Sequence, residues 1–383
     1  MKIHMVDTIT QYEKIREEID TAVLDVVRSG AYINGPAVKQ FQGSLARYMD
    51  VPHVIPCANG TDALQVALMA LDLEPGDEVI TPSFTYIATV EVIALLRLRP
   101  VFVEVDPATY NMDPAALEAA ITPRTKAIMP VHLYGQAADM EPIMEIAAQH
   151  GLYVVEDTAQ ALGAMYTFSD GRRMRVGTIG HIGTTSFYPS KNLGAYGDGG
   201  AIFTRDAGLA EKLWIICNHG AREKYYHESV GVNSRLDSIQ AALLDVKLRY
   251  LDEYTDARRE AARRYDALLA DIPGLELPAW KDDDSHVFHQ YTIRVLAGRE
   301  ARDELRNQLA TRGVPSMIYY PVPIHLQGGY QQYGFKAGDM PLTEHLTEGV
   351  ISLPMHSELD AEQQQFIAGH VREILQAFST ITQ

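Results

Sequence analysis

The strongest constraint on the fold is a regular alternation of strand-like and helix-like segments over about residues 54–160. Short apolar runs alternate there with segments whose apolar residues recur at helical spacing. The runs are HVIPCA, DEVITPS, PVFVEVD, TKAIMPVHLYG and LYVVED, and the helical patterns between them are TDALQVALMAL, TYIATVEVIALLRL, PAALEAAI and MEPIMEIAAQHG. This order predicts an α/β fold, with a mostly parallel sheet between helices. Ligands of such sheets bind beyond the carboxyl ends of the strands.

The last third of the chain does not continue the regular alternation of strand-like and helix-like segments. A long helical pattern covers about Arg235 to Ala270, and the Pro/Gly-rich IPGLELP follows it. A strand-like HQYTIRVL, a helix around ARDELRNQLATRG and a terminal helix come next. We therefore expect a large domain over residues 1–250 and a smaller α+β domain over residues 251–383.

Composition narrows the classes of partner. The net charge of -17 argues against a surface for nucleic acid or anionic membrane, so an anionic ligand needs a local positive site. The two cysteines, Cys57 and Cys217, form no paired motif, which suits a reducing cytoplasm. The first twenty residues carry charges throughout, and no apolar run reaches membrane-spanning length. We expect a cytoplasmic protein.

Two strand ends carry candidate ligand-binding residues. In CANGTDALQ, a turn leads into a helix whose free N–H groups favour a phosphate near Gly60 and Thr61, although a plain capped helix is the alternative. In LYVVEDTAQALGA, Asp157 ends a strand and Gln160 follows it. The carboxylate could cap a following helix, or it could hold the protonated ring nitrogen of pyridoxal phosphate.

Lys191 decides between these interpretations. It stands in TSFYPSKNLGAYGDGG, where small residues allow close approach of a flat ligand and Ser186 can add a hydroxyl to a phosphate. A partly desolvated amine can form a Schiff base with an aldehyde cofactor, whereas most loop lysines are solvated surface charges. The segment spells neither a nucleotide P-loop nor a dinucleotide-binding fingerprint.

Taken together and in order, eight motifs resemble the DegT/StrS sugar-nucleotide aminotransferases, which have the aspartate aminotransferase fold (pyridoxal phosphate fold type I). They are NGTDAL, EVITPSFTYIAT, PVHLYGQ, EDTAQALGA, SFYPSKNLGAYGDGGAI, HGAREKYYH, GVNSRLDSIQAAL and YYPVPIHLQ. The resemblance covers nearly the whole chain. It implies pyridoxal 5'-phosphate as cofactor, and no motif suggests a metal.

The resemblance also implies roles for single residues. Lys191 would be the catalytic lysine that carries the cofactor and shuttles the proton. The cofactor-binding residues would be Gly60, Thr61 and Ser186 at the phosphate, Asp157 at the ring nitrogen, Gln160 beside the ring hydroxyl, Tyr86 on the ring face and Asn233 from a neighbouring subunit. A homodimer with shared active sites is therefore expected.

Substrate residues are implied with less detail. The segment GVNSRLDSIQAA is similar to members acting on 3-keto sugars, and enzymes that aminate UDP-2-acetamido-2-deoxy-3-oxo-glucuronate resemble it most. Arg235 suits a carboxylate of the uronate or of glutamate, with a helix-start ion pair as the alternative. Tyr320 and His325 match positions near the sugar, although His325 could equally be structural.

The implied reaction transfers an amino group from L-glutamate to a keto sugar nucleotide, with ping-pong kinetics. A UDP-linked 3-oxo hexose or hexuronate is the expected acceptor, with a 4-keto hexose carried by dTDP, GDP or UDP as the alternative. Three other classes compete. Sugar 3-dehydratases resemble this group but carry His at the position of Lys191. A regulatory protein could keep the fold and bind pyridoxal phosphate without turnover. A metal-dependent hydrolase would need ligand spacing that histidines such as His132, His181, His219 and His227 do not have.

Overall fold

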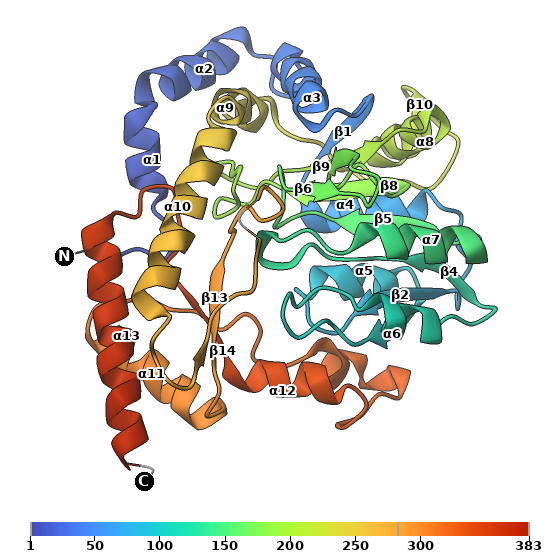
Figure 1. Cartoon of the computed structure of the whole chain (residues 1–383). Helices are drawn as coiled ribbons and strands as arrows, with labels where there is room; N and C mark the ends of the chain where they lie inside the picture. Colours follow the sequence, from blue (N-terminus) through green and yellow to red (C-terminus); the bar gives the residue numbers. More distant parts are fainter. Residues whose placement is uncertain (1, 282, 382–383) are drawn as a thin grey trace.

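The computed structural model describes residues 2–281 and 283–381 of the chain. Within them a seven-stranded sheet has the strand order β1-β9-β8-β5-β4-β2-β3 (Figure 1). Four neighbouring pairs, from β8 to β3, are parallel, and β9 is antiparallel to both of its neighbours. The predicted mostly parallel sheet is confirmed. The strands are β1 (His53–Cys57), β2 (Glu78–Pro82), β3 (Arg99–Val103), β4 (Thr125–Ile128), β5 (Tyr153–Asp157), β8 (Ile182–Ser186) and β9 (Gly200–Thr204).

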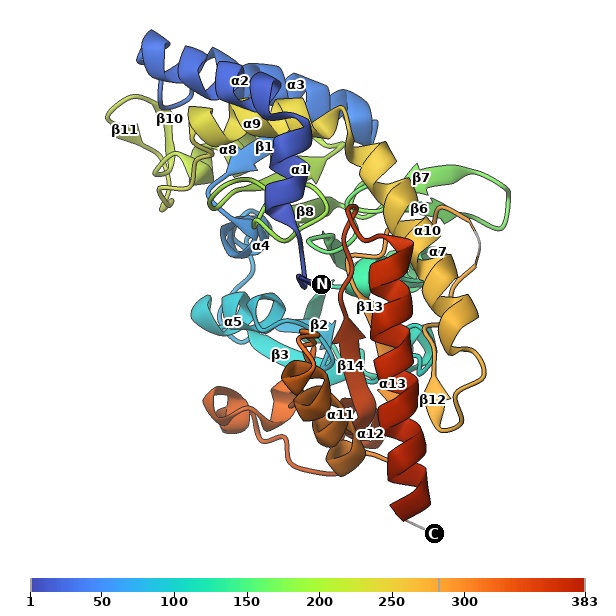
Figure 2. The same cartoon turned by 90° about the vertical axis from the view of Figure 1, so that its left-hand side faces the viewer.

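Helices cover both faces of this sheet because successive strand residues point to opposite sides. Val155 packs in a core with α4 (Gly60–Met69), α5 (Ala88–Leu95) and α8 (Ala207–Cys217). Its neighbour Val154 packs on the other face. That face is covered by α6 (Pro114–Ala119) and α7 (Met140–His150) and, nearer β1 and β9, by α2 (Arg16–Ser29), α3 (Pro36–Met49) and α9 (Ser238–Leu248). Figure 2 shows α2, α3 and α9 packed together at one end of the molecule.

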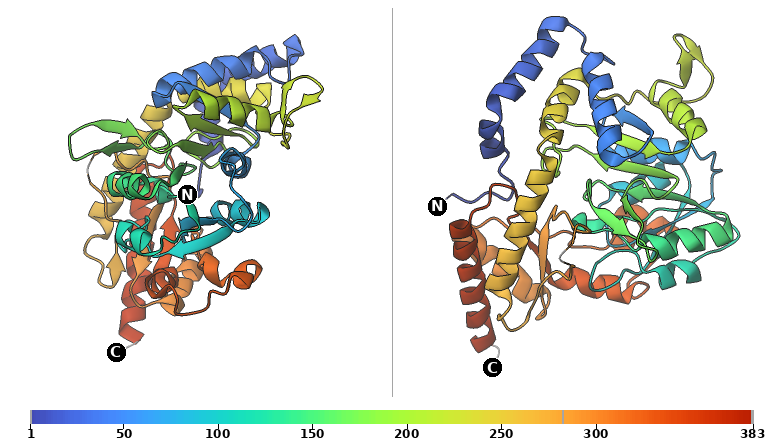
Figure 3. Two further views of the ribbon diagram at one scale, coloured as in Figure 1. Left: turned by 90° about the vertical axis from the view of Figure 1, so that its right-hand side faces the viewer. Right: turned by 45° about the horizontal axis from the view of Figure 1, so that its top comes forward.

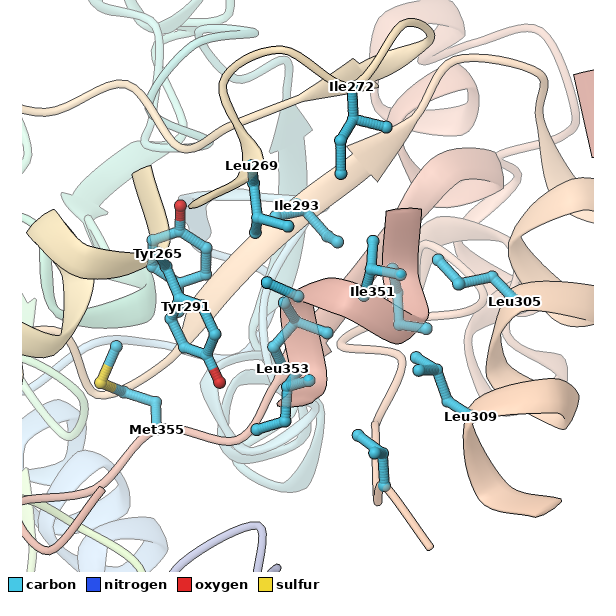
Figure 4. Close-up of a cluster of buried hydrophobic side chains, with 14 of the residues drawn as sticks. Tyr265, Leu269, Ile272, Tyr291, Ile293, Leu305, Leu309, Ile351, Leu353 and Met355 are labelled. Atoms are coloured by element: carbon cyan, nitrogen blue, oxygen red, sulfur yellow. The ribbon is translucent and has the colours of Figure 1, made fainter. Parts of the chain in front are cut away.

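A second core surrounds a three-stranded antiparallel sheet, which contains β12 (Leu275–Glu276), β13 (Tyr291–Val295) and β14 (Val350–Leu353). Figure 4 shows side chains of this core, among them Tyr265, Leu305 and Ile351. Its helices are α10 (Leu251–Leu269), α11 (Arg299–Thr311) and α13 (Ala361–Ile381), whereas α12 (Pro341–Gly349) packs its Leu346 in a separate cluster with Phe84. Ile3 also packs in the second core, so the start of the chain joins this core and not that of the large sheet. The domain boundary at residue 250 stays a prediction.

The long helix expected from Arg235 to Ala270 is instead two helices, α9 and α10, which meet at Arg249 and Tyr250. Leu248 at the end of α9 and Leu251 at the start of α10 pack in the core near β1 and β9, whereas Tyr265, farther along α10, packs in the second core. The chain changes direction between the two helices, although its periodicity continues (Figure 1). In the right-hand view of Figure 3, α10 (yellow) lies beside α13 (red).

Short elements complete the fold. Helix α1 (Thr8–Lys14) precedes α2, and two hairpins lie outside the main sheet. They are β6 (Met165–Thr167) with β7 (Arg173–Arg175), and β10 (Ala221–Glu223) with β11 (Tyr226–His227). Within the described residues, no helix is both long and apolar enough to cross a membrane.

Candidate active site

The carboxyl ends of the parallel strands bring most of the predicted residues to one edge of the sheet. Asp157 is the last residue of β5, and Ser186 is the last residue of the adjacent β8. Tyr86 lies in the loop after β2, and Gly60 begins α4 just after β1. This edge is where an open α/β sheet binds its ligands.

Lys191 lies in the loop that connects β8 to β9. Its amide donates to the Tyr188 carbonyl at 2.8 Å, and the Ala195 amide donates to the Phe187 carbonyl at 2.7 Å, which closes the loop on itself. Lys191 is half-buried, and desolvation lowers its pKa to about 8, against the opposing effect of the negative charge of Asp157. The amine is therefore far more available as a nucleophile near neutral pH than an exposed lysine.

Asp157 is a buried carboxylate with fixed orientation. The Thr89 hydroxyl on α5 donates to its Oδ2 at 2.9 Å, and the Ala159 amide donates to Oδ1 at 3.1 Å. Only a turn follows β5, so the helix-capping alternative does not apply. An anionic group held here suits a cationic ring nitrogen.

Gln160 links the two parts of the chain. Its Oε1 accepts from the Tyr134 amide at 2.6 Å, and its Nε2 donates to the Tyr320 hydroxyl at 3.1 Å. The Tyr320 ring lies 6.1 Å from the ring of Tyr86, centroid to centroid. Tyr86 is 55% exposed, so a flat ring face remains available for a ligand.

Gly60 and Ser186 lie against each other at the start of α4. A Cβ atom on Gly60 would lie 2.7 Å from the Ser186 Cβ, so glycine is required for this approach. The Asn59 side chain caps the helix by accepting from the Asp62 amide at 2.8 Å. The first turn of α4, which contains Thr61, leaves N–H groups free for an anion, as in other helix N-termini that bind phosphate.

Asn233 and Arg235 lie on the segment before α9, and no hydrogen bond joins their side chains to Lys191 or Asp157 among the residues described. Asn233 is exposed. Within the described part of the chain Arg235 has no ion-pair partner, so the ion-pair alternative finds no support. Ser234, between them, accepts from the Ala58 amide at 3.1 Å and holds the segment near the start of α4.

His325 does not face open space, contrary to the expectation of a sugar contact. It is fully buried, and its Nδ1 lies 2.7 Å from the Ser83 hydroxyl. Its Nε2 lies 3.1 Å from the Glu344 carboxylate. Both ring nitrogens are thus engaged within the protein, which supports the structural alternative for this residue.

Three of the four histidines weighed as metal ligands have ring nitrogens engaged within the protein. His132 Nε2 lies 3.0 Å from the Glu156 carboxylate, and the Val154 amide donates to His181 Nδ1 at 2.9 Å. His227 Nδ1 lies 2.9 Å from the His219 carbonyl. In residues 2–281 and 283–381, no group of three potential ligands has metal-binding geometry.

Three neighbouring residues escaped the sequence analysis. Thr89 holds Asp157, and nothing in the sequence links the two because the contact joins separate elements. Asn192 follows Lys191 and donates to the Val287 carbonyl at 2.8 Å, while its Oδ1 is buried without a partner. His289 is buried, and desolvation followed by the positive charge of Lys191 holds its pKa well below the ordinary range.

The residues of this edge fit pyridoxal phosphate. Lys191 supplies an amine for the aldehyde, Asp157 a carboxylate for the ring nitrogen, and the start of α4 with Ser186 a cradle for phosphate.

Sequence comparison finds relatives over the whole length. The model of the DegT/DnrJ/EryC1/StrS aminotransferase family matches residues 13–372. A pleiotropic regulatory protein of Geobacillus stearothermophilus is 48% identical over 99% of this chain and 100% of its own. A UDP-2-acetamido-2-deoxy-3-oxo-D-glucuronate aminotransferase of Pseudomonas aeruginosa is 44% identical over 95% of this chain and 98% of its own. A dTDP-3-amino-3,4,6-trideoxy-alpha-D-glucose transaminase of Streptomyces venezuelae is 42% identical over 97% of this chain and 96% of its own.

Comparison with solved structures finds proteins of the same fold over nearly the whole chain. DesV of Streptomyces venezuelae, in complex with a ketimine intermediate, has a TM-score of 0.92 and 42% identity, covering 98% of both chains. NtdA of Bacillus subtilis, with bound cofactor PMP, has a TM-score of 0.87 and 32% identity, covering 97% of this chain and 83% of its own.

Proposed function

We propose that this chain, which belongs to the DegT/DnrJ/EryC1/StrS aminotransferase family and has pyridoxal phosphate as its cofactor, transfers the amino group of L-glutamate to a UDP-linked 3-oxo hexose or hexuronate. The observation that carries the proposal is the half-buried amine of Lys191 beside the oriented carboxylate of Asp157 at one sheet edge. The net reaction converts glutamate and a ketone into 2-oxoglutarate and an amine.

Lys191 is the proposed proton carrier. When bound, pyridoxal phosphate supplies the electron sink that makes the carbon–hydrogen bond beside the amino nitrogen acidic. With a pKa of about 8, Nζ can take up this proton and return it at a neighbouring carbon near neutral pH. The closed loop keeps the amine at the sheet edge during both halves of the reaction.

The other residues orient the cofactor and charge its ring. Asp157, held by Thr89, would keep the ring nitrogen protonated and so maintain the electron sink. Gln160 would lie beside the ring hydroxyl, and Tyr86 would cover the ring face. The phosphate would bind Ser186 and the first turn of α4, which contains Gly60 and Thr61.

Arg235 supports a carboxylate-bearing substrate. Its guanidinium is half-buried without an ion-pair partner in the described residues, and it could pair with a carboxylate in forked geometry. The relative from Pseudomonas aeruginosa is named for a 3-oxo-glucuronate, whereas relatives named for dTDP- and GDP-linked sugars are also similar. Tyr320, which contacts Gln160 and lies near Tyr86, is the second proposed sugar contact.

A regulatory role is the second candidate, favoured by the name of the 48% identical relative. Against it stands the complete set of Lys191, Asp157, Gln160 and Ser186, which shows no decay of the residues proposed for catalysis and cofactor binding. The presence of Lys191 also favours transamination over sugar dehydration.

The decisive experiment follows the visible absorption of the purified, cofactor-loaded protein. We expect the yellow band of the Lys191-bound cofactor to disappear with L-glutamate and to return with a UDP-3-oxo-hexuronate, more completely than with dTDP- or 4-keto sugars. Lys191→Ala should lower turnover by about 10³-fold or more while the protein stays folded. A loaded wild-type protein whose spectrum ignores glutamate would overturn the proposal in favour of a regulatory role.

A further inference from the structure

A second lysine, buried on α9, contacts the loop that carries Lys191. Lys247 is only 1% exposed, and its Nζ donates to the Gly194 carbonyl at 2.6 Å. The same amine lies 5.1 Å from the centre of the Tyr196 ring, within the range of a cation–π contact. Lys247 therefore binds the loop at two residues, three and five positions after Lys191.

This lysine is expensive to bury. No carboxylate pairs with Lys247 in the described part of the chain, and the nearby charge of Arg258 is repulsive. Desolvation, with a smaller effect of Arg258, lowers its pKa to about 8. An apolar side chain would fill the same space without this desolvation cost, so packing alone does not account for a lysine here.

A second side chain of α9 holds the same part of the loop. Gln240 lies two helical turns before Lys247, on the same face of the helix. Its Oε1 accepts from the Tyr196 amide at 2.9 Å. A Cβ on Gly197 would lie 3.1 Å from the Gln240 Nε2, so helix and loop are in close contact there. Helix α9 thus fixes residues 194–197 from one side.

The loop is folded tightly enough to pass a displacement on to Lys191. A Cβ on Gly194 would lie 2.3 Å from the Pro189 carbonyl oxygen, so the two ends of the Lys191 turn touch. The Ala195 amide also donates to the Phe187 carbonyl at 2.7 Å. A shift at Gly194 therefore moves the backbone on both sides of Lys191.

We propose that Lys247, together with Gln240, is a positioning residue that fixes the 187–197 loop and thereby the place of the Lys191 amine. The inference rests on the proposed function, in which a displacement of about 1 Å in a reacting group is costly. Lys247 acts through the loop and touches neither substrate nor cofactor.

The test compares Lys247→Met, which keeps the length and removes the donor, with Lys247→Arg, which keeps a charged donor. Leu213→Ala is the matched control, because Leu213 is a fully buried residue of α8 whose core contains no residue of the 187–197 loop. Hydrogen exchange of the peptide over residues 187–197 is measured on cofactor-free protein. We expect Lys247→Met to speed exchange there about tenfold, Lys247→Arg to restore most of the protection, and Leu213→Ala to leave this peptide near wild type.

A second measurement follows the kinetics of the cofactor-loaded protein, independently of the hydrogen-exchange experiment. Lys247→Met should lower kcat for the glutamate half-reaction about 10- to 100-fold with little change in KM, because binding of the amino donor is untouched. Equal exchange in Lys247→Met and Leu213→Ala, at matched midpoints of thermal unfolding, would overturn the inference. If instead the wild-type protein does not respond to glutamate while the exchange pattern holds, the proposed function fails and the positioning role stands.

Discussion

At the scale of single residues, the surroundings of Lys191 set its chemistry. The amine of an ordinary lysine has a pKa near 10.5, whereas desolvation lowers the pKa of Lys191 to about 8. The negative charge of Asp157 favours the protonated form and so limits this decrease. Burial and the carboxylate therefore act in opposite directions on the same amine.

The reactivity of Lys191 in cofactor-free protein should report both effects. Labelling by an amine-selective reagent, read by mass spectrometry, should reach half its maximal rate near pH 8, because only the neutral amine reacts. Asp157→Asn should move this midpoint to lower pH, since it removes the charge that raises the pKa. Lys126, exposed on β4, serves as the reference peptide in the same sample.

A midpoint for Lys191 that stays fixed or rises in Asp157→Asn would refute the coupling between the two residues. In loaded protein the same substitution should reduce turnover by about 10²-fold or more, because the ring nitrogen loses its anionic partner. Cofactor affinity should fall less than turnover.

Sequence reasoning reached Lys191 and Asp157 because strand ends can be read from periodicity, and the motifs around them are specific. It could not reach Thr89, since the bond to Asp157 depends on how α5 lies over β5. It left His325 open between sugar contact and structural role, and burial against Ser83 supports the latter. Contacts between distant elements are what the sequence pattern lacks.

At the scale of elements, the start of α4 is defined by its contact with β8. Gly60 is the first residue of the helix, and Ser186 is the last residue of the strand. Their approach leaves no room for a Cβ, which would lie 2.7 Å from the Ser186 Cβ. The proposed phosphate cradle therefore depends on the absence of one methyl group.

Gly60→Ala should weaken cofactor binding about tenfold or more and destabilise the fold by about 1–3 kcal/mol, because helix and strand must move apart. Gly369→Ala is the matched control, since Gly369 lies inside α13 with nothing within 4 Å of an added Cβ. That change should be neutral or stabilise by up to about 1 kcal/mol. Cofactor titration and thermal unfolding measure both variants, and equal cofactor affinity in the two would contradict the cradle.

The break between α9 and α10 shows a limit of periodicity at this scale. The apolar pattern continues through Arg249 and Tyr250, so the sequence predicts one helix. The structure has two: Leu248 and Leu251 on either side of the break pack in the core near β1 and β9, and Tyr265, farther along α10, packs in the second core. Periodicity indicates that a face is buried, but not against which partner.

At the scale of the whole molecule, exposed apolar side chains surround the segment that carries Asn233. Val230 is 85% exposed, and Tyr225 and Tyr226 of the neighbouring hairpin are 79% and 67% exposed. Exposed large apolar side chains that gather in one segment are typical of association sites. It supports the proposed homodimer, in which Asn233 would complete the active site of the partner subunit.

If each active site is built from both subunits, two inactive variants can restore activity when they are combined in one dimer, which sites built within single subunits would not allow. Lys191→Ala and Asn233→Ala should each be strongly impaired alone, yet unfolding and refolding them as an equal mixture should recover activity. Half of the dimers are then mixed, and each mixed dimer has one site with both native residues, so about one quarter of wild-type activity is expected. Each variant refolded alone is the control.

The size of the recovery distinguishes the possible arrangements. If Asn233 served the site of its own subunit, a mixed dimer would have one site without Lys191 and one without Asn233, and mixing would recover nothing. If Asn233 had no part in any site, Asn233→Ala alone would be fully active. Recovery near one quarter, together with a dimer mass by light scattering, therefore requires that Lys191 of one subunit and Asn233 of the other act in one site.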